Sequence, residues 1–122
     1  MGIIVNESIP WGAGDPPLQT PTGMYLRVYW IERCHKDSDR RPGGPGAAPD
    51  GAEWCLRFQT QFWADQTSAN TEGKRQFDTR EYEFWLTADQ LTSNDHALAY
   101  DYLDTTVLTP LVADPASIVR VD

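Results

Sequence analysis

Three segments of the chain are dense in aromatic and β-branched residues and are separated by polar stretches rich in Gly and Pro. They run over residues 24–36, 53–65 and 77–86. Apolar side chains recur there with a period close to two, which is typical of β-strands. The connections between the segments are too short for crossover helices. The pattern therefore predicts an antiparallel meander over residues 24–86.

Alternation divides the side chains of this meander between two faces. One face is consistently apolar, and we expect it to be the core: Met24, Leu26, Val28, Trp30, Trp54, Leu56, Phe58, Thr60, Phe62, Tyr82, Phe84 and Leu86. The second face mixes Tyr25, Tyr29, Ile31, Trp63 and Trp85 with charged residues, among them Arg57, Glu81 and Glu83. Protein interfaces are enriched in Tyr, Trp and Arg. The second face is therefore expected to be covered either by the chain's own helix and N-terminal arm or by another subunit.

The first 23 residues predict a short strand and then an arm. Residues 2–9, GIIVNESI, can add a strand to a sheet edge, and residues 10–23 hold four prolines and three glycines. Because Pro removes amide donors and Gly disfavours regular structure, this second part is expected to be extended. If Trp11 stayed in water, its large apolar surface would remain unburied, which favours an arm laid across a neighbour.

A helix is expected only after the meander, within residues 87–104. Thr87 and Gln90 have the spacing of a capping box, and Ser93 can cap a second segment. Pro110 and Pro115 prevent a continuous helix further on, so residues 105–122 are expected to be extended, ending in a strand. The predicted fold is one mainly β domain of 122 residues, a compact antiparallel sheet or barrel-like sandwich with one short helix.

Charge and hydropathy narrow the range of partners. The chain has 18 acidic and 10 basic residues and a net charge of −8, whereas a nucleic-acid surface needs clustered Lys and Arg. No apolar run approaches the roughly 20 residues of a membrane span. The first residues lack the basic start of a signal peptide. We therefore expect no nucleic acid, no membrane, and synthesis in the cytoplasm.

No catalytic residue, metal or cofactor is predicted. Alternation sends Cys34 and Cys55 to opposite faces, which excludes a disulfide between them unless a β-bulge reverses the parity. These cysteines, with His35 and His96, form no zinc-binding spacing. Acids on the third strand, Asp78, Glu81 and Glu83, leave a small acid-dependent hydrolase as a third alternative, although a solvated strand edge explains them more simply.

Residues 80–105, REYEFWLTADQLTSNDHALAYDYLDT, resemble small virion proteins of tailed bacteriophages, some of which pair an antiparallel hairpin with a helix ending in AY-x-YL-x-T. Asp101, Asp104 and the tail TTVLTPLVADP depart from that version. The resemblance implies a structural or adaptor subunit of a virion, in head decoration, neck, baseplate or tail, bound to other virion proteins or to itself. The expected interface residues are Trp11, Tyr25, Tyr29, Trp63 and Trp85. The main alternative is a monomeric binding module that recognises a ligand or host receptor through the loop 37–52.

Overall fold

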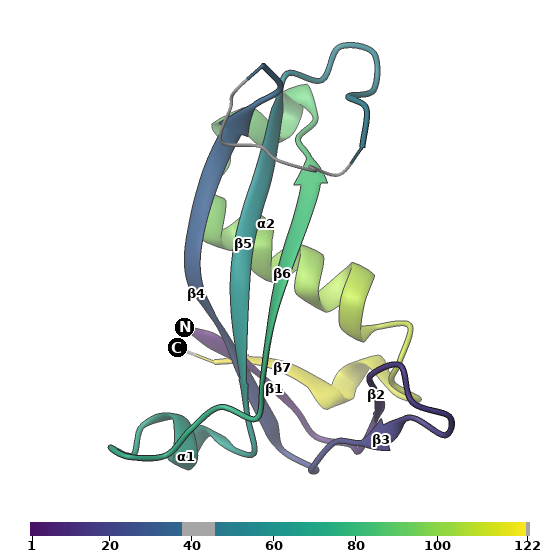
Figure 1. Ribbon diagram of the computed structural model, residues 1–122, viewed down its shortest axis with the longest axis vertical. Coiled ribbons are helices and arrows are strands. Elements are labelled where there is room, and N and C mark those ends of the chain that lie inside the picture. Colours follow the sequence, from purple (N-terminus) through teal and green to yellow (C-terminus); the bar gives the residue numbers. More distant parts are fainter. Residues whose placement is uncertain (38–45, 122) are drawn as a thin grey trace.

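The structure is a computed structural model that describes residues 1–37 and 46–121. Within these residues, five strands form one antiparallel sheet in the order β6-β5-β4-β1-β7 (Figure 1). The strands are β1 (Gly2–Val5), β4 (Met24–His35), β5 (Trp54–Trp63), β6 (Asp78–Trp85) and β7 (Ile118–Val121), and β2 (Pro10–Trp11) pairs separately with β3 (Leu18–Gln19). The predicted mainly β fold is confirmed, but the sheet is open and not barrel-like.

The core lies between this sheet and one helix over residues 95–108, which we call the main helix. The main helix crosses one face of β4, β5 and β6 (Figure 1). Phe58 at the centre of β5 is fully buried and packs against the rings of Tyr82 and Tyr102. Tyr102 also stacks on Phe84 with ring centroids 4.7 Å apart. The apolar face predicted for β5 and β6 is therefore the core face. We call the opposite side of the sheet, turned away from the helix, the second face.

One extra residue in β4 reverses its alternation halfway along. Val28 pairs with Thr60, but Trp30 pairs with Gln59, so Tyr29 is the additional residue of a β-bulge. Ile31 and Arg33 consequently lie opposite Phe58 and Leu56, on the core face. Trp30, Glu32 and Cys34 move to the second face. The predicted faces of Trp30 and Ile31 were therefore wrong, because no residue type in the sequence marks this bulge.

The same bulge corrects the expectation for the cysteines. Cys34 and Cys55 were predicted on opposite faces, but they are direct cross-strand partners on the same face. Neither cysteine is nevertheless part of a disulfide. The absence of a disulfide was thus predicted, but for a reason that the register contradicts.

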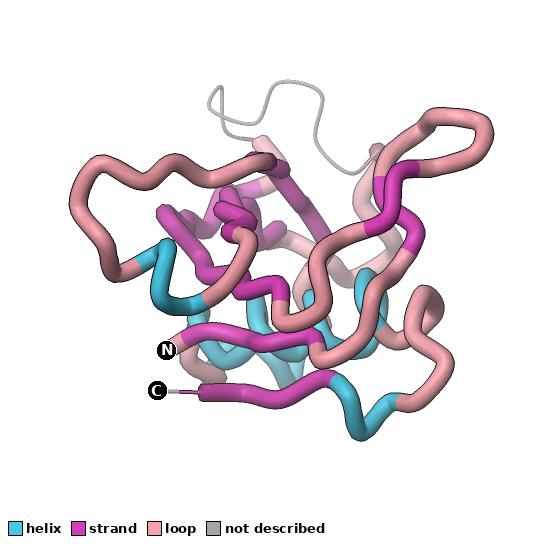
Figure 2. The backbone as a smooth tube through the Cα atoms, turned by 90° about the horizontal axis from the view of Figure 1, so that it is seen from below, coloured by secondary structure: helices cyan, strands magenta, loops and turns pink. Residues whose placement is uncertain are grey.

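β1 pairs with the edge of β4 that faces away from β5, and Ile3 lies opposite Leu26 there. β7 pairs with the other edge of β1. β1 is therefore an interior strand, and the predicted last strand is confirmed as β7. Figure 2 shows these two strands side by side, with both chain ends at the same end of the pair. Near the start of β1, the Tyr100 hydroxyl accepts a hydrogen bond from Val28 N (3.0 Å) and donates one to Met1 O (3.1 Å).

The helical region runs over η1 (Ala88–Thr92), α2 (Asp95–Tyr102) and the π-helical turn η2 (Leu103–Leu108). The predicted capping box is present, and Thr87 N donates to Gln90 Oε1 over 2.9 Å. The N-cap of α2 is Asn94, however, and not Ser93. The helix passes the predicted end at residue 104 because Leu108 is fully buried, and it stops just before Pro110. Pro115 begins η3 (Pro115–Ser117).

The N-terminal arm folds back onto its own chain. β2 and β3 form a small hairpin, in which Thr20 N donates to Ile9 O over 2.9 Å. Gly12 and Gly23 have positive φ angles of 92° and 90°, which other residues rarely adopt. Of the predicted loop 37–52, residues 38–45 lie outside the described residues.

Candidate functional site

Part of the second face is covered within the chain. Tyr25 and Trp63 form a cross-strand pair and are only 5% and 6% exposed. The short helix α1 (Gln66–Ala69) packs against β4 and β5 at this end of the sheet (Figure 1). The Tyr25 ring also lies over Gly2, where a Cβ atom would collide with it. Tyr25 and Trp63, both predicted as interface residues, therefore serve the chain's own packing.

Trp11 is likewise used inside the chain, on the core side. Its ring packs on Phe62 with centroids 4.8 Å apart, and its Nε1 donates to Asp78 Oδ2 over 2.7 Å. The Arg80 guanidinium lies 4.1 Å from the centroid of the Trp11 ring and donates to the same Asp78 oxygen. Burial alone would raise the pKa of Asp78, but the hydrogen bonds from Trp11 and Arg80 hold this pKa below its ordinary value. The arm was expected to lie across a neighbour, and in the structure it packs on the sheet of its own chain.

The rest of the second face carries a charged cluster centred on Arg57, which we call the Arg57 cluster. Arg57 Nη2 lies 3.2 Å from Glu81, Nε 3.4 Å from Glu83, and Nη1 3.8 Å from Glu32. The hydrogen bond to Glu81 is the main cause that raises the pKa of Arg57. The guanidinium also lies 5.5 Å from the centroid of the Trp30 ring. With one cation among three carboxylates, the cluster has a formal net charge of −2.

Tyr29 lies beside this cluster and is the most exposed aromatic side chain among the described residues, at 64%. At the bulge, Tyr29 and Trp30 both lie opposite Gln59 of β5. Gln59 is two residues from Arg57, the centre of the Arg57 cluster. An exposed Tyr beside half-buried Trp and Arg is a composition typical of interface cores. Of the five predicted interface residues, Tyr29 is the one that the structure leaves open to solvent.

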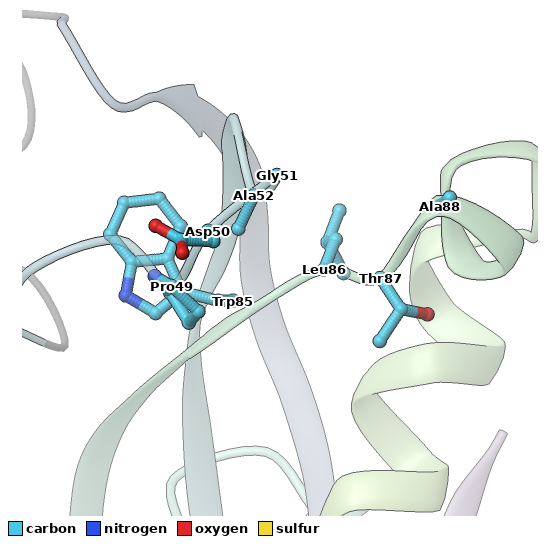
Figure 3. Close-up of a pocket in the computed structure, with 8 residues that line it drawn as sticks. All are labelled: Pro49, Asp50, Gly51, Ala52, Trp85, Leu86, Thr87 and Ala88. Carbon is cyan, nitrogen blue, oxygen red and sulfur yellow. The ribbon is translucent and has the colours of Figure 1, made fainter.

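Trp85, the fifth predicted residue, lines a hollow of about 340 Å³. Figure 3 shows the Trp85 ring beside Pro49 and Asp50 at the end of the predicted loop, with Leu86 and Thr87 following Trp85 along the same segment. A hollow of this volume is near the lower limit for sites that bind small molecules, about 300 Å³. It is the feature of the described residues that fits the binding-module alternative.

A second hollow of about 280 Å³ separates the β2–β3 hairpin from the start of β6. Trp11 and Arg80 line it, and the exposed side chains of Leu18 and Phe77 flank it. The alternation of residues in the sequence did not indicate this groove, because Leu18 and Phe77 are brought together only by the folded arm.

The acidic residues of β6 are divided between the two faces. Glu81 and Glu83 share Arg57 on the second face, whereas Asp78 binds Trp11 and Arg80 on the other. They do not flank one cleft as a pair of glycosidase carboxylates would. This arrangement gives no support to the hydrolase alternative.

The cysteines and histidines do not converge. His35 packs edge-on against Trp54, with ring centroids 4.9 Å apart, and Cys34 points to the other face. His96 is exposed on α2. In the part of the chain that the structure describes, no group of three or more His, Cys, Asp or Glu residues could hold a metal ion.

Sequence alternation had placed Arg57 on the second face but had not identified it as a hub. The sequence did offer one indication, because Glu81 and Glu83 fall on the same predicted face as Arg57 and give this single Arg two acidic neighbours. Glu32 and Trp30 join the cluster only through the bulge. Alternation therefore indicated three of the five residues, and the bulge supplied the other two.

Comparisons with known proteins give no match to a family model, a curated protein or a solved structure. Among residues 1–37 and 46–121, no helix is both long and apolar enough to cross a membrane.

Proposed function

We propose that this chain is a non-catalytic structural or adaptor subunit of a tailed-phage virion that binds neighbouring proteins through the open part of its second face. The observation that carries the proposal is the exposed Tyr29 next to the Arg57 cluster. A large aromatic side chain left in water forfeits roughly 25 cal/mol per Å² of apolar area, which a docked partner recovers. The resemblance of residues 80–105 to small virion proteins supports the assignment to a phage particle.

The charge of the open surface indicates the chemistry of the partner. The Arg57 cluster keeps a formal excess of two negative charges, and Glu81 is still 45% exposed. A neighbouring protein that presents Lys or Arg beside an apolar contact would complement both features. The chain itself has 10 basic residues against 18 acidic ones, which favours a different, basic virion protein over a second copy.

The test uses particles made by the phage or host that encodes the chain. The variant Tyr29→Ser with Glu81→Lys changes only the open surface, and Leu18→Ser is the matched control because Leu18 is 79% exposed on the β2–β3 hairpin. Trp63 is unsuitable for this test because its burial would confound binding with folding. We expect the wild type and Leu18→Ser in purified particles at a fixed copy number. The double variant should still fold, with a thermal midpoint lowered slightly by loss of the Arg57–Glu81 hydrogen bond, but be missing from the particles.

Two results would count against the proposal. The wild type could be absent from purified particles, or the double variant could be incorporated as well as the control. Either result would turn attention to the binding-module alternative, which rests on the hollow lined by Trp85 and residues 49–52. Ala88→Trp would fill this hollow, so it should abolish capture of a ligand or receptor by the isolated chain.

A further inference from the structure

Cys34 and Cys55 lie directly opposite each other on β4 and β5. Two positions further along the same ladder, Lys36 N donates to Glu53 O over 2.8 Å. Because hydrogen-bonded pairs recur every two residues, Cys34 and Cys55 form such a pair, with Cα atoms about 5.5 Å apart. Disulfides usually join Cα atoms about 4.4–6.8 Å apart. The backbone therefore holds the two cysteines at bridging distance.

The side chains need only a small approach to each other. Cβ atoms of a cross-strand pair are about 4.5–5.5 Å apart. A disulfide brings Cβ atoms to about 3.5–4.5 Å. The sheet would have to contract locally by roughly 1 Å to form the bond, and disulfides under such strain are more easily reduced. The register thus fits a bond that can form and be broken again, rather than a permanent structural bridge.

The surroundings determine which thiol reacts first. Cys55 is fully buried, opposite Trp85 of β6, whereas Cys34 keeps 4% of its surface exposed. Cys34 Sγ donates to Glu32 Oε1 at 3.6 Å. Burial, and after it the Glu32 charge, raises the pKa of Cys34 to about 11, although Arg57 acts in the opposite direction. At neutral pH the thiol is protonated, and it exchanges slowly.

We propose that Cys34 and Cys55 form a reversible intramolecular disulfide by exchange with a small-molecule disulfide of the glutathione type. The Cys34 thiolate attacks one sulfur of the oxidant, breaks its S–S bond, and releases one small thiol. The Cys55 thiolate then attacks Cys34 Sγ in the mixed disulfide and releases the second small thiol. The protein loses two hydrogens and gains one S–S bond, while the oxidant is reduced to two thiols.

The bond would tie β4 to β5 near their ends at His35 and Trp54 and would close a loop of the chain from residue 34 to residue 55. A closed loop of this size restricts the unfolded chain, so the oxidised protein should have the higher thermal midpoint. The same bond lies next to Trp85, which lines the hollow shown in Figure 3. Oxidation would therefore make this end of the sheet more rigid, and no second protein is needed for the effect.

The experiment equilibrates the full folded chain in mildly alkaline buffers that range from reduced to oxidised glutathione and stops exchange with acid. The free thiols are then alkylated in denaturant at near-neutral pH, and the intact mass is measured. At the oxidised end we expect a loss of two hydrogen masses and a proteolytic fragment pair joined through Cys34 and Cys55. We also expect a raised thermal midpoint that dithiothreitol reverses. Cys34→Ser and Cys55→Ser should show none of these changes, and Cys55→Ser should take up glutathione faster than Cys34→Ser.

Two outcomes would overturn the proposal. The folded wild type could keep two alkylatable thiols at every buffer ratio, or it could carry only glutathione adducts at equilibrium. If the serine variants fail to fold, the wild-type mass and fragment map at the two ends of the series still decide between these results.

Discussion

Arg33 of β4 binds Asp95 in the first turn of α2, with Nε 2.6 Å from Oδ1. The same guanidinium donates from Nη1 to Leu91 O (2.8 Å) and from Nη2 to Ser93 O (3.0 Å). One side chain therefore joins the sheet to the end of η1 and to the start of α2. It reaches them because the bulge at Tyr29 turns Arg33 toward the helix.

Replacing Arg33 with Ala should lower the free energy of unfolding by about 2 kcal/mol, because hydrogen bonds to a charged group are worth about 1.5–3 kcal/mol. Arg33→Lys should recover less than half of this loss, since an ammonium cannot reach three acceptors in the fork geometry of a guanidinium. Urea denaturation measures both. Arg120→Ala is the control: its ion pairs with Asp101 and Asp104 are more exposed and should cost less than about 1 kcal/mol.

Tyr100→Phe should lower the free energy of unfolding by about 1–2 kcal/mol, because the Val28 amide and the Met1 carbonyl both lose their partner. Hydrogen exchange of the Val28 amide should become faster in this variant. Tyr29→Phe removes a hydroxyl from an exposed ring and should change stability by less than about 0.5 kcal/mol. An unchanged Val28 exchange rate in Tyr100→Phe would contradict the role given to the hydroxyl.

The hydrogen bond between Trp11 and Asp78 should make stability depend on acid pH. Because the pKa of Asp78 is lowered in the folded state, its contribution is complete above its ordinary value of 3.8 and is lost as the pH falls through the folded pKa. Trp11→Phe should cost about 1–2 kcal/mol at neutral pH and progressively less below pH 3.8. In an Asp78→Asn background, the cost of Trp11→Phe should no longer vary with pH. Thermal unfolding across the acid range tests this.

Deleting Tyr29 should preserve the native faces of β4, because only the extra residue of the bulge is removed. Val28 and Trp30 become consecutive and can keep their partners Thr60 and Gln59, so that Arg33 stays on the core face. Tyr29→Ser should likewise leave the fold almost unchanged. Near-ultraviolet circular dichroism and thermal unfolding measure both variants. Loss of the cooperative, native-like transition in the deletion variant alone would show that the fold needs the bulge itself.

The strands of the meander could be predicted from the sequence because their apolar residues repeat with the period of the pleat. In β5, the run from Trp54 to Phe62 alternates without interruption, and Leu56, Phe58, Thr60 and Phe62 are buried as the pattern indicated, although Cys55 of the second face is buried as well. The capping box at Thr87 and Gln90 was equally visible, since it depends on residues only three positions apart. These features are local, and local chemistry suffices for them.

The candidate site was only partly predictable. Alternation placed Arg57, Glu81 and Glu83 on one face, as observed. It could not show that Tyr25, Trp63 and Trp11 are covered by their own chain, because α1 and the β2–β3 hairpin reach them through folding and not through sequence proximity. The expected set of five interface residues is therefore reduced to Tyr29 and, in part, Trp85.

By itself, the sequence determined which segments become strands, which face of β5 and β6 is buried, and where the helix starts to within one residue. Only the tertiary structure decided that Cys34 faces Cys55, that Arg33 reaches α2, and that Tyr29 stays in solvent. The physical reason is the bulge in β4. An extra residue is accepted where the strand outruns its short neighbour β1 and must curve around the main helix, and the packing of that helix sets the register of everything beyond it.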